Sequence, residues 1–317
     1  MKTWIVTDGK IGTEKQCRAL AEMLGLKAAV KTISVKFPWT LLPPSFWIKP
    51  CSALDSASQK ELSEPWPDLI IAASRVASAP IAALKKKLGK KITTIFIQNP
   101  YINLNAFDAV IAPRHDKLSG SNLISIPGAL HNVTKDLLIK ESKKWTSILP
   151  TDFPRPWVTI LLGGNSNHHT MDLDTIEYFG AQLRHLAQRS SMSFFITASR
   201  RTPQEALQVF KTALGDSHVF LWNGLGDNPY YGFLGLGDFI LVTNDSVSML
   251  SEAVGAGKPV YTLNLPGGNG RLDKFQDHLI EQGLCRPFEG ELETWVQKPF
   301  DLKSYLLQQL KKKIKIL

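Results

Sequence analysis

One stretch, residues 237–265, constrains the fold more than any other part of the 317-residue chain. It reads GDFILVTNDSVSMLSEAVGAGKPVYTLNL, and its first apolar run, residues 239–243, stops at the polar turn Asn244-Asp245-Ser246. A helical pattern follows, and a second apolar run begins after a Gly-Lys-Pro turn. This order predicts a strand, a helix and a strand, with the helix N-terminus at the carboxyl end of the first strand.

The predicted helix has a polar face that could bind a ligand. Its first turn, which includes Asn244, Asp245, Ser246 and Ser248, offers unpaired amides and the positive end of the helix dipole to a phosphate. Glu252 lies further along the same face, where a carboxylate could hold the two hydroxyls of a ribose. The structural alternative stays open, because Asn, Asp and Ser are common helix caps and an exposed Glu is usually only solvated.

Composition describes an ordinary globular protein with a basic surface. The net charge of +9 and the pI near 9.3 favour an anionic partner, which could be a nucleotide, nucleic acid or a membrane surface. The three cysteines show no CxxC spacing, so neither a disulfide framework nor a zinc site is indicated, and a reducing cytoplasm fits best. The sequence shows no signal region and no run long enough to span a membrane.

Strand patterns alternate with helical patterns along the whole chain, which predicts parallel sheets covered on both faces. The proline-rich residues 149–156 interrupt both patterns. We therefore predict an N-terminal α/β domain at 1–150 and a second α/β domain at 151–300. Residues 301–317 predict a basic amphipathic helix, which either packs back on the body, the favoured reading, or lies on an anionic membrane.

Two loops with glycine follow predicted first strands. Residues 8–13, DGKIGT, lead into a predicted helix at 14–24, and Gly163-Gly164-Asn165 follows the predicted strand at 157–162. The two glycines of the first loop allow the backbone to approach a ligand closely, although this loop is not GxGxxG and tight turns also use glycine. The second loop suits backbone amides directed at an anion.

A possible metal-binding pattern is a weaker signal. His168-His169 with Asp172 and Asp174 could suggest a metal, but adjacent histidines point apart and the two aspartates suit a helix start, so no metal site is predicted.

Three further side chains could serve a nucleotide. Trp222 could stack on a base or lie in the core. Arg271 and Lys274 follow the proposed phosphate site closely in sequence.

Residues 37–50, FPWTLLPPSFWIKP, combine aromatic and aliphatic side chains with four prolines. We expect these apolar side chains to fold back onto the core. Exposed, they would form a patch flanked by Lys36 and Lys49 that suits a membrane interface or a lipid-linked substrate.

With these residues in view, the chain resembles the bacterial branch of the plant elongated-mitochondria fission factor family, which is grouped with GT-B glycosyltransferases. The resemblance implies an α/β fold of two Rossmann-like, doubly wound domains that face each other across a cleft. It extends over most of the chain and rests on Asp8-Gly9-Lys10 with Gly12 and Gln16, on Gly163-Gly164, on Asn228-Pro229-Tyr230 and above all on residues 243–261, TNDSVSMLSEAVGAGKPVY.

A wider likeness is to the GT-B enzyme that adds N-acetylglucosamine to a lipid-linked peptidoglycan precursor. The matching positions are Ser251-Glu252-Ala253 with Gly257 and Pro259. This likeness implies that Glu252 binds ribose, that residues 244–248 face the diphosphate and that residues 163–165 form a second phosphate-side loop. It also implies that no metal is needed.

One departure from that pattern concerns the catalytic base. Enzymes of this type often have a His at the end of the first glycine loop, where this chain has Thr13. Asp8 or Glu14 could act as the base instead, since a carboxylate that activates an acceptor hydroxyl needs only reach and a suitable pKa.

The sequence therefore predicts a metal-independent glycosyltransferase without a separate cofactor. It would transfer a sugar from a nucleotide-sugar, UDP-linked by the likeness, to an acceptor that could be lipid-linked. A nucleotide-sugar epimerase and a non-enzymatic, membrane-associated recruitment protein are the alternatives. We expect a cytoplasmic protein with an option of peripheral contact at the inner face of an anionic membrane, and no nucleic-acid partner.

Overall fold

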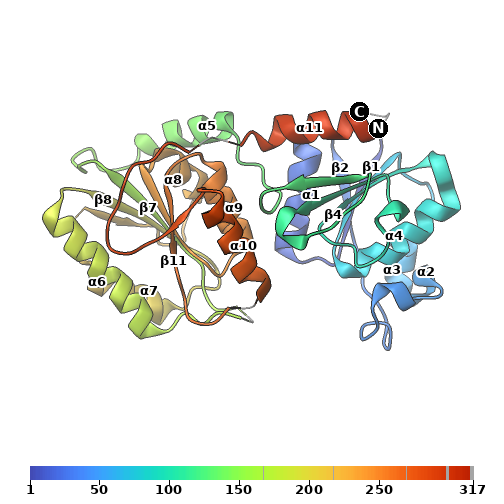
Figure 1. Cartoon of the computed structure of the whole chain (residues 1–317), viewed down its shortest axis with the longest axis horizontal. Coiled ribbons are helices and arrows are strands. Elements are labelled where there is room, and N and C mark those ends of the chain that lie inside the picture. The colour runs from blue at the N-terminus through green and yellow to red at the C-terminus, as the bar shows by residue number, and fades with distance from the viewer. Residues whose placement is uncertain (167, 217, 269, 298–299, 315–317) are drawn as a thin grey trace. The chain divides into compact units, whose positions relative to one another are not determined.

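The computed structural model describes residues 1–166, 168–216, 218–268, 270–297 and 300–314, and it describes Arg271 without its side chain. Within these residues the chain forms two compact units. The first unit combines Met1–Asn132 with the C-terminal helix that begins at Leu302, and the second unit is Val133–Asp301. Figure 1 shows the elements of each unit.

The first unit is built on a parallel sheet. Its strands are β1 (Thr3–Thr7), β2 (Ala28–Thr32), β3 (Leu69–Ala73), β4 (Thr93–Ile97), β5 (Ala109–Pro113) and β6 (Leu123–Ile126), and its helices are α1 (Ile11–Met23), α2 (Pro50–Ala53), α3 (Ser56–Glu61), α4 (Arg75–Leu88) and α11 (Leu302–Lys313). The strands lie in the order β2-β1-β3-β4-β5-β6. The chain turns from β2 to β3 across β1, so the switch point of this sheet lies between β1 and β3.

The second unit repeats this plan. Its strands are β7 (Trp157–Leu162), β8 (Ser193–Ala198), β9 (Val219–Leu221), β10 (Phe239–Thr243), β11 (Val260–Leu263) and β12 (Arg286–Pro287), and its helices are α5 (Lys135–Thr146), α6 (Leu173–Arg189), α7 (Gln204–Leu214), α8 (Tyr230–Leu236), α9 (Val247–Gly255) and α10 (Gly270–Glu281). The strands are parallel and lie in the order β12-β11-β10-β7-β8-β9. The predicted fold of two doubly wound α/β units is confirmed.

Alternate side chains of the second sheet serve two separate cores, as the period of two along a strand requires. On one face, Ile160 and Phe194 pack with α6 and α7. On the other face, Leu161 packs with residues of α5, α8, α9 and α10, and Phe195 packs with Phe233 of α8. Both faces of these strands are apolar for this reason, which is why the strands read as continuous apolar runs.

The boundary between the units differs from the predicted one. It falls after Asn132, so α5 belongs to the second unit although the proline-rich segment follows it. The physical reason is its packing against α8, where a Cβ on Gly232 would lie 2.3 Å from Trp145 Cδ1 and a Cβ on Gly235 would lie 2.8 Å from the Leu138 carbonyl oxygen. Two glycines on α8 therefore let α5 approach closely.

The C-terminal helix α11 packs on the first unit (Figure 1, red). Its apolar stripe, Leu302, Leu306 and Leu310, is buried. Tyr305 donates a hydrogen bond from its hydroxyl to the Ser125 carbonyl oxygen at 3.1 Å, which ties the helix to β6. Among the described residues, no helix has the length and apolar character that crossing a bilayer would take.

The apolar segment after β2 does not fold onto the core as expected. Within residues 37–48 only Trp47 and Pro44 are buried, and Trp39 is half-buried. Trp47 packs with Ala53 and Ala79 in a small cluster, and Trp39 packs against its edge. We call the exposed set, Phe37, Leu41, Leu42, Phe46 and Ile48, the apolar loop.

A buried histidine in the first unit predicts acid sensitivity. Burial, and then the charge of Lys15, lower the pKa of His131 to about 4, against about 6.5 for an unfolded chain. The folded protein therefore binds fewer protons than the unfolded chain between these values, so stability is retained above pH 6.5 and falls as the pH drops toward 4. The loss from this group is at most about 3 kcal/mol.

Urea unfolding of the wild type and two variants across this pH range measures the effect. His131→Gln should flatten the slope between pH 6.5 and 4, whereas the exposed His185 on α6 provides the control His185→Gln. Equal slopes for wild type and His131→Gln would contradict the assignment.

Candidate functional site

Polar groups gather at the carboxyl edge of the second sheet, at its switch point. From β7 the chain proceeds to β8 and β9 on one side, and it returns with β10 and β11 on the other. β7 and β10 are therefore neighbours in the sheet, and the chain leaves their carboxyl ends in opposite directions. Gly163-Gly164 follows β7, and Asn244-Asp245 follows β10. Ligands of open α/β sheets commonly bind in the crevice at such a point.

Asp245 is the centre of a buried network that joins three strand ends. Its side chain is fully buried. Oδ1 accepts a hydrogen bond from the Thr243 hydroxyl at 2.7 Å, while Oδ2 accepts from the Gly164 N–H at 3.2 Å and from Arg201 Nη2 at 2.6 Å. The Gly163 N–H donates to Thr243 Oγ1 at 2.7 Å. Asp245 therefore holds the loops after β7, β8 and β10 together.

The two glycines are required by the closeness of these loops. A Cβ on Gly163 would lie 1.9 Å from Asp245 Oδ1, and a Cβ on Gly164 would lie 2.1 Å from the Arg201 carbonyl oxygen. The Gly164 position is the stricter one, because its neighbour is backbone and cannot rotate away. These two glycines therefore let the loops after β7, β8 and β10 lie close together.

Arg201 is a site residue that was not predicted from the sequence. Its guanidinium lies on the Asp245 carboxylate, and Nη1 donates to the Asn165 carbonyl oxygen at 3.2 Å. The side chain is 42% exposed, so Arg201 is accessible to solvent while it pairs with a fully buried carboxylate. The signal was the pair Arg200-Arg201, which follows β8 after one residue, at the same sheet edge as the glycine loop.

The residues that begin α9 are already engaged within the unit. The Ser246 hydroxyl caps the helix by accepting from the Met249 N–H at 3.3 Å. Asn244 Oδ1 accepts from the Leu265 N–H at 2.9 Å. Ser248 is half-buried. The structure thus brings together the predicted phosphate-site residues and gives two of them a capping or bridging bond.

Glu252 does not lie on an exposed polar face, contrary to expectation. It is 2% exposed. Burial, and then the Glu252 carboxylate, raise the pKa of Tyr230 well above its ordinary value, so the two side chains are in electrostatic contact. The physical reason is that Tyr230 comes from the neighbouring helix α8, which the helical period of α9 alone does not reveal.

The remaining predicted nucleotide residues are more scattered. Asn165 is exposed and its Oδ1 accepts from the Met171 N–H at 2.8 Å. Trp222 follows β9, the edge strand, and donates from its indole to the Leu225 carbonyl oxygen at 2.9 Å. Lys274 is exposed on α10. The side chain of Arg271 lies outside the described residues.

The histidine and aspartate pattern does not form a metal cluster. Asp172 is the N-cap of α6 and accepts from the Thr175 N–H at 2.9 Å, as the helix-start interpretation predicted, and this bond lowers its pKa. His169 is buried. In the part of the chain that the structure describes, no group of three or more His, Cys, Asp or Glu side chains is placed to bind a metal ion.

The two proposed bases lie in the first unit. Asp8 follows β1 at the switch point of that sheet and pairs with Lys10, with 3.1 Å between Oδ2 and Nζ. Glu14 lies in the first turn of α1, which begins at Ile11 and not at residue 14 as predicted, and it pairs with Arg18 at 2.7 Å. Ser74 faces the same switch point from the end of β3, with φ +87° and a buried hydroxyl that has no hydrogen-bond partner among the described residues.

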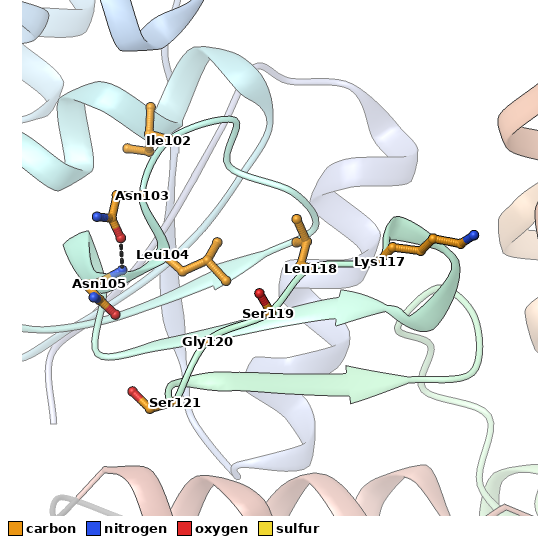
Figure 2. Close-up of a pocket in the computed structure, with 9 residues that line it drawn as sticks. All are labelled: Ile102, Asn103, Leu104, Asn105, Lys117, Leu118, Ser119, Gly120 and Ser121. Atoms are coloured by element: carbon orange, nitrogen blue, oxygen red, sulfur yellow. Dashed lines mark hydrogen bonds between the residues drawn. The ribbon is translucent and has the colours of Figure 1, made fainter.

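A hollow of about 480 Å³ in the first unit lies elsewhere. Figure 2 shows that residues 102–105 and 117–121 line it. These segments precede β5 and β6, so the hollow lies toward the amino edge of the sheet, away from the edge where Asp8 and Ser74 lie. It contains none of the predicted site residues.

The fold and the switch-point site define the class of protein. Two parallel doubly wound units of this kind match solved GT-B structures. The UDP-GlcNAc 2-epimerase of Neisseria meningitidis bound to UDP-GlcNAc has a TM-score of 0.55 at 14% identity, covering 100% of this chain and 92% of that one. Acinetobacter baumannii MurG has a TM-score of 0.54 at 12% identity, covering 99% and 94%. At these identities the likeness shows the GT-B-like fold alone.

The sequence places the chain more closely. The family model of mitochondrial fission ELM1 matches residues 11–311, so the chain belongs to that family. The uncharacterized protein RP120 of Rickettsia prowazekii (strain Madrid E) is 28% identical, over 100% of this chain and 99% of its own. The mitochondrial fission protein ELM1 of Arabidopsis thaliana is 29% identical over 74% of this chain and 61% of its own. The predicted family resemblance is confirmed.

Proposed function

We propose that the chain is a metal-independent glycosyltransferase that binds a nucleotide-sugar at the switch point of the second sheet. The observation that carries the proposal is Arg201, whose half-exposed side chain is held beside a glycine loop by a buried carboxylate. Asp245 alone would repel a diphosphate. Paired with Arg201, its charge is neutralised, and the guanidinium N–H groups that do not donate to Asp245 or Asn165 can donate to phosphate oxygens.

The proposal assigns separate tasks to the described groups. The amides of the Gly163-Gly164 loop and of the first turn of α9 would stabilise the diphosphate, together with Arg201 and Lys274. Trp222 would stack on the base. Glu252 would accept hydrogen bonds from the ribose hydroxyls. These bonds would replace its contact with Tyr230.

The chemistry is a transfer of a glycosyl group. The acceptor oxygen forms a bond to the anomeric carbon while the bond from that carbon to the diphosphate breaks, and UDP leaves with the electron pair. The acceptor proton would pass to a carboxylate of the first unit, Asp8 or Glu14. The UDP-GlcNAc bound by the Neisseria meningitidis neighbour supports a UDP-sugar donor.

Calorimetric titration with UDP and UDP-GlcNAc tests the proposal. We expect wild-type binding that weakens about 10- to 100-fold in Arg201→Ala, because a charge-assisted hydrogen bond to phosphate is lost. Arg200→Ala is the matched control, since Arg200 is exposed one residue earlier. Arg201→Lys should recover part of the affinity, because it restores the charge without the planar fork.

Two outcomes of the titration would contradict the proposal. One is the absence of binding at millimolar nucleotide. The other is an equal loss in Arg200→Ala and Arg201→Ala, which would indicate a diffuse charge effect. Thermal unfolding of each variant separates a loss of binding from a loss of the Asp245 network.

Product analysis separates the alternatives. The epimerase neighbours favour a second candidate, an epimerase, which would change the sugar of UDP-GlcNAc without an acceptor. A transferase releases UDP only when an acceptor is present. A non-enzymatic recruitment protein, the candidate that the family favours, would bind neither nucleotide nor sugar.

A further inference from the structure

The apolar loop of the first unit has no role in the proposed transfer. Four of its side chains are strongly exposed: Ile48 at 88%, Phe37 at 78%, Leu41 at 73% and Phe46 at 66%. Single exposed apolar residues are normal, but a contiguous exposed set marks an interaction site. Figure 1 shows this blue segment projecting from the body of the first unit near α2 and α3.

Specific contacts hold the loop in this shape. The Arg75 guanidinium donates to the carbonyl oxygens of Thr40 at 2.7 Å and Leu42 at 2.8 Å. The Trp47 indole donates to the Leu42 carbonyl oxygen at 3.0 Å, and its ring is buried. The apolar side chains are therefore presented outward by a fixed backbone, which lowers the entropic cost of binding.

Many backbone groups of the loop do not depend on water for a hydrogen bond. Two turns pair the N–H groups of Leu41, Leu42, Phe46 and Trp47 with carbonyl oxygens inside the loop. Its three prolines, Pro38, Pro43 and Pro44, have no N–H to satisfy. Unpaired backbone groups are what usually exclude an irregular loop from an apolar phase, and here many are already paired or absent.

The charged residues within 36–54 have one sign. Lys36 and Lys49 are exposed at its two ends, and no Asp or Glu occurs in residues 36–54. Burial raises the pKa of the Cys51 thiol and the charge of Lys87 on α4 partly offsets this rise, so Lys87 lies near the end of the loop. Cations around exposed apolar side chains complement an anionic lipid surface, where each Lys or Arg adds about 1 kcal/mol.

We propose that the apolar loop docks the protein on an anionic lipid bilayer by inserting its exposed side chains into the interfacial layer. A second copy of the chain fits less well, because five loop side chains supply less than the roughly 800 Å² that each partner buries in a standard interface. The docking does not depend on the nucleotide site, since Arg201 belongs to the other unit.

Vesicle flotation with the full chain tests this proposal. We expect binding to equimolar phosphatidylcholine and phosphatidylglycerol and much weaker binding to phosphatidylcholine alone. Replacing the loop residues Phe37, Leu41, Phe46 and Ile48 by Ser should lower the partition about 10- to 100-fold, because apolar area no longer enters the bilayer. The variant should fold, since these side chains are exposed.

Two matched controls define the outcome. Replacing four exposed aliphatic residues of the second unit by Ser should leave flotation unchanged; they are Ile139, Ile148, Leu225 and Val296. Lys36→Glu with Lys49→Glu should reduce binding to the anionic vesicles more than the same reversal at the exposed Lys303 and Lys312 of α11.

Three results would overturn the proposal. They are wild-type protein that does not float with anionic vesicles, a loop variant that floats like wild type, and equal effects of the two charge reversals. A dimer in sedimentation velocity that the loop variant loses, without vesicle binding, would assign the loop to a second copy instead. None of these results bears on the nucleotide site, which titration in the absence of vesicles tests separately.

Discussion

Gly164→Ala should lower the free energy of unfolding of the second unit by about 3 kcal/mol, the upper range for forced overpacking of a tight site. The added methyl would lie 2.1 Å from the Arg201 carbonyl oxygen and 2.6 Å from the Thr202 nitrogen. Both neighbours are backbone, so the loop after β7 must separate from the loop after β8. That separation also pulls the Gly164 N–H from Asp245, and nucleotide affinity should fall with it.

Urea unfolding measures the loss of stability, and hydrogen exchange of peptides shows whether the loss falls in the second unit. Gly12→Ala is the control, because a Cβ there meets nothing within 4 Å and Gly12 lies inside α1. The control should be neutral or gain about 0.5–1 kcal/mol from helix propensity. A Gly164→Ala protein as stable as wild type would show that the two loops are not packed as closely as the structure has them.

The sequence was sufficient for the fold because the strands are buried on both faces. Residues 239–243 became β10 and the helical pattern after them became α9, as the change of period predicted. The same logic located β7 and the glycine loop after it. The apolar period along the sequence is therefore enough to predict a strand or helix whose formation does not depend on which other elements pack beside it.

The site was predicted less fully because its bonds join distant elements. Asp245 was expected to face a ligand, but the end of β8 supplies Arg201 and the end of β7 supplies the Gly164 N–H, and both bonds turn its carboxylate inward. Glu252 was expected on a polar face, yet Tyr230 of α8 contacts it. Neither partner can be identified before the strand order and helix packing are known.

Two errors of organisation have a similar origin. The prolines at 149–156 were a visible interruption, whereas the real boundary after Asn132 depends on small residues of α8 that accept α5. The apolar loop was expected in the core because large exposed patches are uncommon. Its exposure follows from the bonds of Arg75 and Trp47 to its backbone, which the pattern of apolar residues does not contain.

Trp145→Ala should destabilise the second unit by about 3–5 kcal/mol, the usual cost of removing a large buried aromatic side chain. Trp145 is 6% exposed and meets Phe233 edge to face, with 5.8 Å between ring centroids. Its ring also covers Gly232, where any larger residue would clash. Alanine leaves a cavity between α5 and α8 that this glycine cannot fill.

The control is Trp145→Phe, which keeps an aromatic ring against Phe233. It also removes an indole N–H that is buried and has no hydrogen-bond partner among the described residues. We expect a change below about 1.5 kcal/mol, because the lost volume is partly offset by the loss of an unsatisfied donor. Hydrogen exchange should show the alanine effect in α5, α8 and the second sheet but not in β1 to β6. If first-unit peptides exchanged faster instead, α5 would belong with the N-terminal residues, as the proline-rich segment had suggested.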